Sequence, residues 1–190
     1  MDSNEVTVLL GEARSGRGDA PSRVWAALQS ELQAIAAQSS DGPLDERTVT
    51  DSTLLDAAYR DLFGSEIPEW RNRGEFLDAV ARSMADFLRH RHRERTLSGE
   101  TRACELTGTA GELTEFTQAD SDESIQALDI VDEIGREAPD TARVARLRFI
   151  LGLDNKQTAR SLGLDDRTAE LKWRFSQAMI RRGLSRGVNE

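Results

Sequence analysis

Residues 154–184 read DNKQTARSLGLDDRTAELKWRFSQAMIRRGL, and this stretch decides the fold of the C-terminal third of the chain. Asp154 is a candidate N-cap for a short helix, because its side chain can accept hydrogen bonds from the free amides of a first helical turn. Gly163 then supplies a residue that tolerates the positive φ of a tight turn. Asp165 can cap a second helix over about 166–182. The segment therefore predicts a helix-turn-helix.

The second of these helices has two contrasting faces. One face collects apolar side chains that we expect to pack on the core, namely Ala169, Trp173, Ile180 and Leu184. The opposite face collects the side chains that point away from that core, namely Arg167, Glu170, Leu171, Arg174, Phe175, Ala178 and Arg181. A recognition helix presents a face of this kind to the major groove of DNA.

Composition and periodicity extend the helical prediction to the whole chain. Of its 190 residues only 5% are aromatic, and Ala, Leu, Arg and Glu are abundant, which favours helix over sheet. Apolar side chains recur at helical spacing in further segments, namely about 6–13, 24–35, 54–62, 72–95, 125–136 and 139–151. In the last of these we expect Arg143, Arg146 and Arg148 to point outward. The fold class predicted is all-α.

Charge divides the chain into three parts. Residues 1–97 carry 12 basic and 17 acidic side chains, residues 98–124 carry 1 and 7, and residues 125–190 carry 12 and 10. The middle part is rich in Gly, Ser, Thr and acid, so we interpret it as an acidic linker between two small helical domains. The overall charge of −9 argues against nucleic acid, but the last part is net positive.

Several classes of protein are excluded by what the sequence contains. The single Cys104 rules out an internal disulfide and a multi-thiolate metal site, and His90 and His92 point to different sides of a helix. No apolar run approaches the length of a membrane span, and the acidic start is unlike a secretory signal, so the cytoplasm is expected. There is no Gly-rich phosphate loop and no nucleophile–base pair. We therefore expect neither an enzyme nor a cofactor.

Residues 147–173, LRFILGLDNKQTARSLGLDDRTAELKW, resemble region 4 of bacterial sigma factors of the extracytoplasmic-function (ECF) type. LDAAYRDLFG at 55–64 and IPEWRNRGEFLDAVARSMADFLRHRHRER at 67–95 are similar to region 2. The region 2 segment follows the family pattern W-x-N-R-x-x-F and is most similar to a planctomycete-like subgroup. The residues in register with that pattern are Trp70, Asn72, Arg73, Phe76, Met84 and Leu88. The chain departs from the family at Ala57, Ala85 and Asp86, and at Glu170 and Leu171, where Lys or Arg is usual.

The resemblance implies a specificity subunit of RNA polymerase that does no covalent chemistry. The first domain would dock on the β′ clamp of core polymerase and melt the −10 promoter element, and the second would contact the β flap and read the −35 element. An anti-sigma factor is a further candidate partner. The acidic linker would thread the polymerase cleft, or serve only as a flexible tether.

Candidate DNA-binding residues follow from the matched segments. For the −35 element they are Arg167, Thr168, Lys172 and Arg174, with Arg146 and Arg148 as phosphate contacts. For strand separation they are the loop 64–72 with Trp70, Asn72 and Arg73, and the basic helix end with Arg89, Arg91, Arg93 and Arg95. The alternative for each is structural: solvated charges beside acidic neighbours, cations at a helix C-terminus, and a tryptophan that anchors the core.

For the polymerase contact the candidates are Leu54, Leu55, Asp56, Tyr59 and Arg60. A second function from another class stays open, namely a sigma-like regulator that acts through protein contacts after Glu170, Asp86 and the overall acidity have weakened its DNA surface. A further hypothesis is an inhibited form in which the two domains pack face to face, because their charges differ.

Overall fold

The computed structural model describes residues 11–12, 22–30, 47–64, 70–98 and 122–187, and within these ranges it is helical without any strand. This confirms the all-α prediction. The helices are a segment over 22–30, α3 (Arg47–Phe63), α4 (Arg73–Ser98), α5 (Asp122–Glu137), α6 (Pro139–Phe149), α7 (Asn155–Leu162) and α8 (Asp166–Gly187). Of the helix expected over 6–13, only residues 11–12 lie within the described part of the chain.

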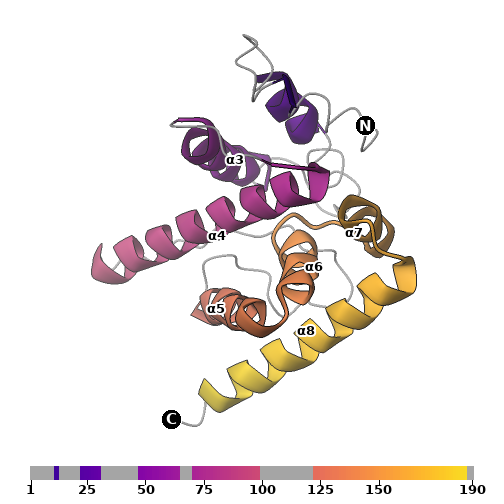
Figure 1. Ribbon diagram of the computed structural model, residues 1–190. Coiled ribbons are helices and arrows are strands. Elements are labelled where there is room, and N and C mark those ends of the chain that lie inside the picture. The colour runs from indigo at the N-terminus through magenta and orange to yellow at the C-terminus, as the bar shows by residue number, and fades with distance from the viewer. Residues whose placement is uncertain (1–10, 13–21, 31–46, 65–69, 99–121, 188–190) are drawn as a thin grey trace.

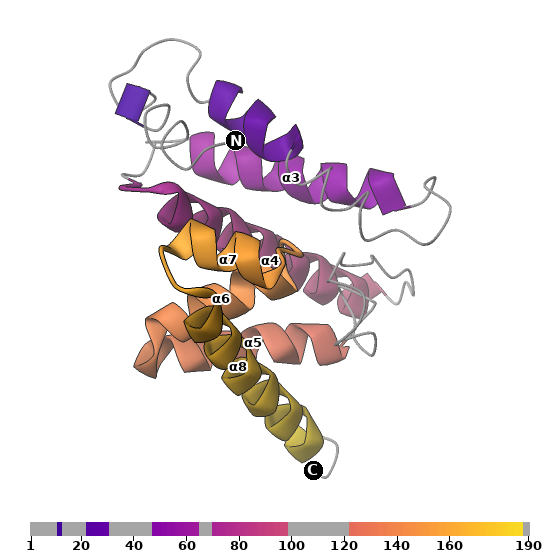
Figure 2. The ribbon, with the colours of Figure 1, turned by 90° about the vertical axis from the view of Figure 1, so that its right-hand side faces the viewer.

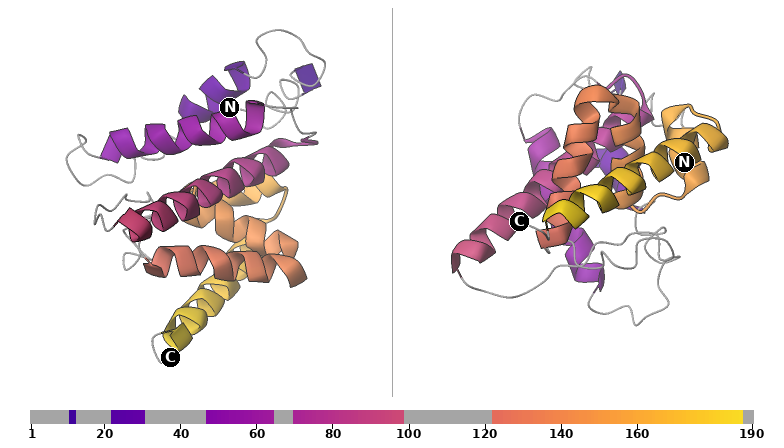
Figure 3. Two further views of the ribbon diagram at one scale, coloured as in Figure 1. Left: turned by 90° about the vertical axis from the view of Figure 1, so that its left-hand side faces the viewer. Right: turned by 90° about the horizontal axis from the view of Figure 1, so that it is seen from below.

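The helices are stacked in layers around α4 (Figure 1). The segment 22–30 and α3 lie on one side of α4, and α5, α6 and α7 lie on its other side. α8 covers the side of α5 and α6 that faces away from α4, as the view in Figure 2 also shows. Seen from the opposite side in Figure 3, α4 is the central layer of the molecule.

Aromatic side chains hold α3 on the first side of α4. Trp25 packs on Tyr59 with ring centroids 5.4 Å apart, and Phe63 lies between these rings and Trp70. Trp70 in turn meets Phe76 at 5.0 Å in an edge-on arrangement, which is a favoured geometry for aromatic pairs. Aliphatic side chains complete this part of the core, among them Val24, Leu28, Leu54, Leu55, Leu62, Leu77, Val80 and Leu88.

The second part of the core lies between α5, α6 and α8. Its fully buried members include Leu128, Val131, Val144, Leu147 and Ile180. Pro139 begins α6, which suits proline because the first turn needs no amide donor from it. Gly183 of α8 approaches α5 so closely that an added Cβ would lie 2.4 Å from Ile130.

The predicted helix-turn-helix is confirmed in its local chemistry. The backbone amide of Gln157 donates to Asp154, and the side chain of Gln157 accepts from the Asp154 amide, which makes a complete capping box. Gly163 closes α7 with φ 66°, the left-handed conformation that glycine adopts without strain. The amide of Thr168 donates to Asp165 at 2.8 Å, so Asp165 caps α8 as predicted.

One prediction about side-chain direction is wrong. Arg146 and Arg148 do not point outward from α6, and both are buried, while Arg143 is half-buried. The reason is that α6 is surrounded, because α4, α5, α7 and α8 all pack against it. A short helix with neighbours on every side has no solvated face for its arginines.

The parts of the two expected domains that the structure describes pack directly on each other. α4, from the first domain, contacts α5, α6 and α7 of the second. At the start of α4, a Cβ added to Gly74 would lie 2.6 Å from the carbonyl oxygen of Ser161 in α7. The boundaries 1–97, 98–124 and 125–190 stay a prediction.

Candidate nucleic-acid interface

The outer face of α8 is exposed and carries the side chains expected there. Arg167, Arg174, Ala178 and Arg181 are exposed, and Glu170 is half-buried. Two large apolar side chains, Leu171 and Phe175, are 59% and 53% exposed on the same face. Ala169, Trp173 and Ile180 are buried on the inner face. Cations interspersed with exposed apolar groups can contact both phosphates and base edges in a major groove.

Thr168 and Lys172, two of the predicted contact residues, lie at the margin of this face. Thr168 donates its hydroxyl to Asp165 at 2.6 Å, so this side chain takes part in capping the helix. That hydrogen bond, with the one from the Thr168 amide, holds the pKa of the Asp165 carboxyl below its usual value. Lys172 is half-buried. Arg167 and Arg174, on either side of Lys172 in sequence, are the more exposed cations of this part of α8.

Glu170 organises two of the candidate arginines. Its carboxylate accepts from Arg174 at 2.8 Å and from Arg148 of α6 at 3.1 Å. These hydrogen bonds, led by the one from Arg174 and opposed by burial, hold the pKa of Glu170 below its usual value of 4.5. Arg148 also lies over the ring of Trp173, 4.7 Å from its centroid, in a cation–π contact. Arg148 is thus part of the packing between α6 and α8.

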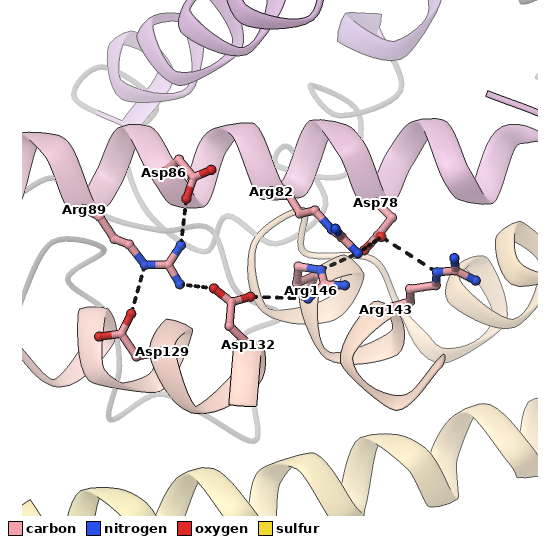
Figure 4. A network of polar contacts seen from close by, with 8 residues as sticks. All are labelled: Asp78, Arg82, Asp86, Arg89, Asp129, Asp132, Arg143 and Arg146. Atoms are coloured by element: carbon pink, nitrogen blue, oxygen red, sulfur yellow. Dashed lines mark hydrogen bonds and ion pairs between the residues drawn. The ribbon is translucent and has the colours of Figure 1, made fainter. Parts of the chain in front are cut away.

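Arg146 is held even more firmly. Arg146 is only 4% exposed. Its Nε donates to Asp78 of α4 at 2.7 Å, and its Nη1 donates to Asp132 of α5 at 3.4 Å (Figure 4). Asp78 also pairs with Arg82 at 3.0 Å and with Arg143 at 3.7 Å. In this arrangement Arg146 has no path to a phosphate.

The basic side chains of α4 divide into two groups. Arg89 is 14% exposed and binds Asp86 of its own helix and Asp129 and Asp132 of α5. Burial lowers the pKa of Arg89, but Asp132 and then Asp129 and Asp86 raise it by more, so the net shift is upward. Arg91 lies over the ring of Phe87 at 5.9 Å, and Arg93 is exposed. The side chain of Arg95 lies outside the described residues.

The two histidines of α4 take separate partners. His90 is 3.2 Å from Glu94, and His92 is 3.1 Å from Asp122 of α5. Among the residues that the structure places, no group of three or more His, Cys, Asp or Glu is suited to a metal ion.

The loop before α4 uses its predicted residues structurally. Trp70 packs on Phe63 and Phe76, and the side chain of Asn72 accepts from the amide of Glu75 at 3.0 Å, which caps α4. Glu75 completes this turn by accepting from the amide of Arg71 at 2.8 Å. Arg73 is buried. The rest of the expected base pocket, residues 65–69, lies outside the described part of the chain.

A family model described as "ECF sigma factor" matches residues 3–186, which is nearly the whole chain. The chain belongs to the ECF sigma factor family. No curated protein and no solved structure gives a significant match. Members of this family act with core RNA polymerase and promoter DNA in the initiation of transcription, and they are not enzymes. In the described parts of this ECF sigma factor, no helix is long and apolar enough to span a membrane.

The candidate polymerase contact of this ECF sigma factor is divided between the core and the surface of α3. Leu54 and Leu55 are buried, and Tyr59 packs between Trp25 and Phe63. Asp56 and Arg60 are exposed, and Nε of Arg60 donates to the backbone carbonyl of Asp56 at 3.3 Å. Of the five predicted residues, Asp56 and Arg60 are therefore exposed, Tyr59 is half-buried, and Leu54 and Leu55 belong to the core.

Sequence reasoning missed the acidic residues that hold this ECF sigma factor together, namely Asp78, Asp129 and Asp132. A signal was present on α4. Asp78, Ala81 and Ala85 fall on one side of a helix by their spacing, and both alanines are fully or nearly fully buried. Small residues beside a carboxylate indicate close approach of a second helix, which here brings an arginine.

Proposed function

We propose that this ECF sigma factor reads the −35 element with the outer face of α8 and melts the −10 element with the region around α4. The observation that carries the proposal is the exposed face of a well-capped second helix in a helix-turn-helix, with arginines at its start and middle. The proposed partners are the β′ clamp and the β flap of core polymerase, and an anti-sigma factor. We also propose that the chain belongs to the planctomycete-like subgroup of the family.

On α8, Arg167 and Arg174 are the proposed contacts to bases or phosphates, with Thr168 and Lys172 at the margin. Leu171 and Phe175, which are exposed, are the proposed contacts to thymine methyl groups, the apolar features of the major groove. Arg181 is also exposed and extends the cationic track toward the C-terminal end of the helix. Arg146 and Arg148 contribute by fixing α6 against its neighbours.

For the −10 element we propose Arg91, Arg93 and Arg95 as contacts to the displaced strand, with Arg89 joining them when it is released from its aspartates. The loop with Trp70, Asn72 and Arg73 supports the base pocket by fixing the start of α4. Asp56 and Arg60, which are exposed, are the proposed polymerase contact. Since a sigma factor acts on promoter DNA, we propose the cytoplasm as its location.

A second candidate function is a sigma-like regulator that acts through protein contacts. Two observations favour it: Leu171 and Phe175 expose apolar area that a protein partner can also cover, and Glu170 neutralises part of the arginine charge around it.

The test is a pull-down with core RNA polymerase followed by run-off transcription. A sigma factor forms a holoenzyme that starts at a defined site, binding without initiation supports the regulator, and absence of binding defeats both. On DNA, Arg174→Ala should reduce the salt slope of promoter affinity by about one unit, because one phosphate contact is lost. Arg136→Ala, which removes an exposed charge from α5, is the matched control. An unchanged slope for Arg174→Ala removes this residue from the interface.

A further inference from the structure

Arg89 links the two halves of the molecule through carboxylates. It projects from α4 and binds Asp129 and Asp132, which lie one helical turn apart on α5, as Figure 4 shows. A guanidinium between two oxyanions is also how an arginine binds a nucleic-acid backbone. Asp129 and Asp132 therefore occupy Arg89 in the way that phosphates would.

Asp132 extends this link to a third helix. Its second carboxylate oxygen accepts from Arg146 of α6, which in turn binds Asp78 of α4. The chain of contacts thus runs from α4 to α5, on to α6 and back to α4. We call these five residues, Asp78, Arg89, Asp129, Asp132 and Arg146, the interdomain clamp.

A steric contact accompanies the clamp at the start of α4. Gly74 lies against the backbone of Ser161 and the side chain of Leu162 in α7, with no room for a methyl group. Since α7 is the first helix of the helix-turn-helix, α4 contacts the C-terminal half at its start as well as at the clamp. The face of α4 that carries Arg89 is covered as a result.

We propose that this arrangement is a self-inhibited form, in which the interdomain clamp withholds Arg89 and its face of α4 from promoter DNA until the two halves separate. The proposal rests on the proposed function of α4 in strand binding. DNA phosphates compete with Asp129 and Asp132 for the same guanidinium, so DNA binding and the clamp exclude each other at Arg89. Opening is then a shift between two states that a partner with higher affinity for the open one can drive.

The experiment uses the full chain with Asp129→Asn and Asp132→Asn combined, since both changes keep side-chain shape and remove the two charges of α5 that hold Arg89, while Asp86 of its own helix stays in place. The matched control combines Glu133→Gln and Glu137→Gln, which removes equal charge from exposed positions on the same helix outside the clamp. Small-angle scattering measures compaction, and fluorescence anisotropy measures affinity for labelled oligothymidine. Circular dichroism checks that every variant is folded.

We expect the Asp129/Asp132 variant to expand and to bind the oligonucleotide about fivefold or more tightly than the wild type, while the control stays compact and within about twofold. Gly74→Ala, which changes no charge, should expand the particle and raise the affinity in the same direction. An Asp129/Asp132 variant as compact as the wild type, or an equal gain in affinity by the control, would overturn the inference.

The failure of the inference is distinguishable from failure of the proposed function. Wild-type binding equal to that of an expanded variant refutes inhibition and leaves the DNA role intact. If neither the wild type nor any expanded variant binds DNA, both the inhibition and the DNA role of α4 are refuted, and the regulator becomes the better account.

Discussion

The pair between Asp78 and Arg146 shows how much can depend on one carboxylate. Both side chains are nearly inaccessible to solvent, and Asp78 faces three arginines from two helices. A buried ion pair adds little net stability over apolar packing, but removing one partner leaves the other charge buried without compensation. The cost of losing Asp78 is therefore much larger than the worth of the pair itself.

Asp78→Ala should lower the free energy of unfolding by about 3 kcal/mol, at the lower end for a broken buried pair because Arg146 keeps Asp132. Asp86→Ala removes an exposed carboxylate from the same helix and should cost about 0–1 kcal/mol. Urea unfolding followed by circular dichroism measures both. Equal losses for the two variants would contradict the buried role of Asp78.

Glu170 gives the fold a dependence on pH. Its carboxyl has a lower pKa in the folded protein than its usual 4.5, so the folded state favours the ionised form. The resulting stability is complete above pH 4.5 and is lost as the pH falls through the folded-state pKa. We expect Glu170→Gln to be less stable than the wild type by about 1 kcal/mol at pH 7, with the gap closing as the pH falls below 4.5 and through the folded-state pKa. Urea midpoints across this pH range measure the gap, and a gap that widens on acidification would contradict the assignment.

At the scale of the element, the turn between α7 and α8 isolates a backbone effect. An added Cβ at Gly163 meets no atom within 4 Å, so a substitution there changes only the cost of φ 66°. Gly163→Ala should destabilise the protein by about 1 kcal/mol, because alanine is strained in the left-handed region. Gly163→Asn is the matched control and should cost less, since asparagine tolerates that region. Thermal unfolding measures both, and equal costs would mean that the turn rearranges.

The elements also show where prediction from sequence works. Asp154, Gly163 and Asp165 were assigned correctly, because capping and turn formation depend on residues within one helical turn. Arg146 was assigned to a solvated face, because periodicity along α6 carries no information about how many neighbours cover it. Among the candidate site residues, Leu54 and Leu55 proved to be core for a similar reason, since an apolar stripe looks alike against a partner protein and against a core.

At the scale of the whole molecule, α4 belongs to both halves. Its aromatic side packs with α3 and its other side packs with α5, α6 and α7. Sequence composition divided the chain at an acidic segment and could not show that the flanking helices come together. Such contacts join residues far apart in the chain, such as Arg89 and Asp129, 40 positions apart, and Asp78 and Arg146, 68 positions apart.

This sharing of α4 predicts cooperative unfolding. The wild type should unfold in one transition that is the same by far-ultraviolet circular dichroism and by tryptophan fluorescence, because α4 packs against both halves and couples their unfolding. Gly74→Ala should separate the two signals by loosening α7 from α4, whereas Gly11→Ala, where an added Cβ meets nothing, is the matched control. Coincident transitions in Gly74→Ala would show that the close approach is not needed for coupling.

The interdomain clamp also limits how this sigma factor can be recombined with others. A chimera that joins its C-terminal half to another N-terminal half would transplant Arg146 into a setting without Asp78, and a guanidinium would then be enclosed without its main counter-ion. Chimeras that fold should therefore have an aspartate at the position of Asp78 in the N-terminal half. The residue at that position indicates which N-terminal halves can be combined with this C-terminal half when promoter specificity is engineered.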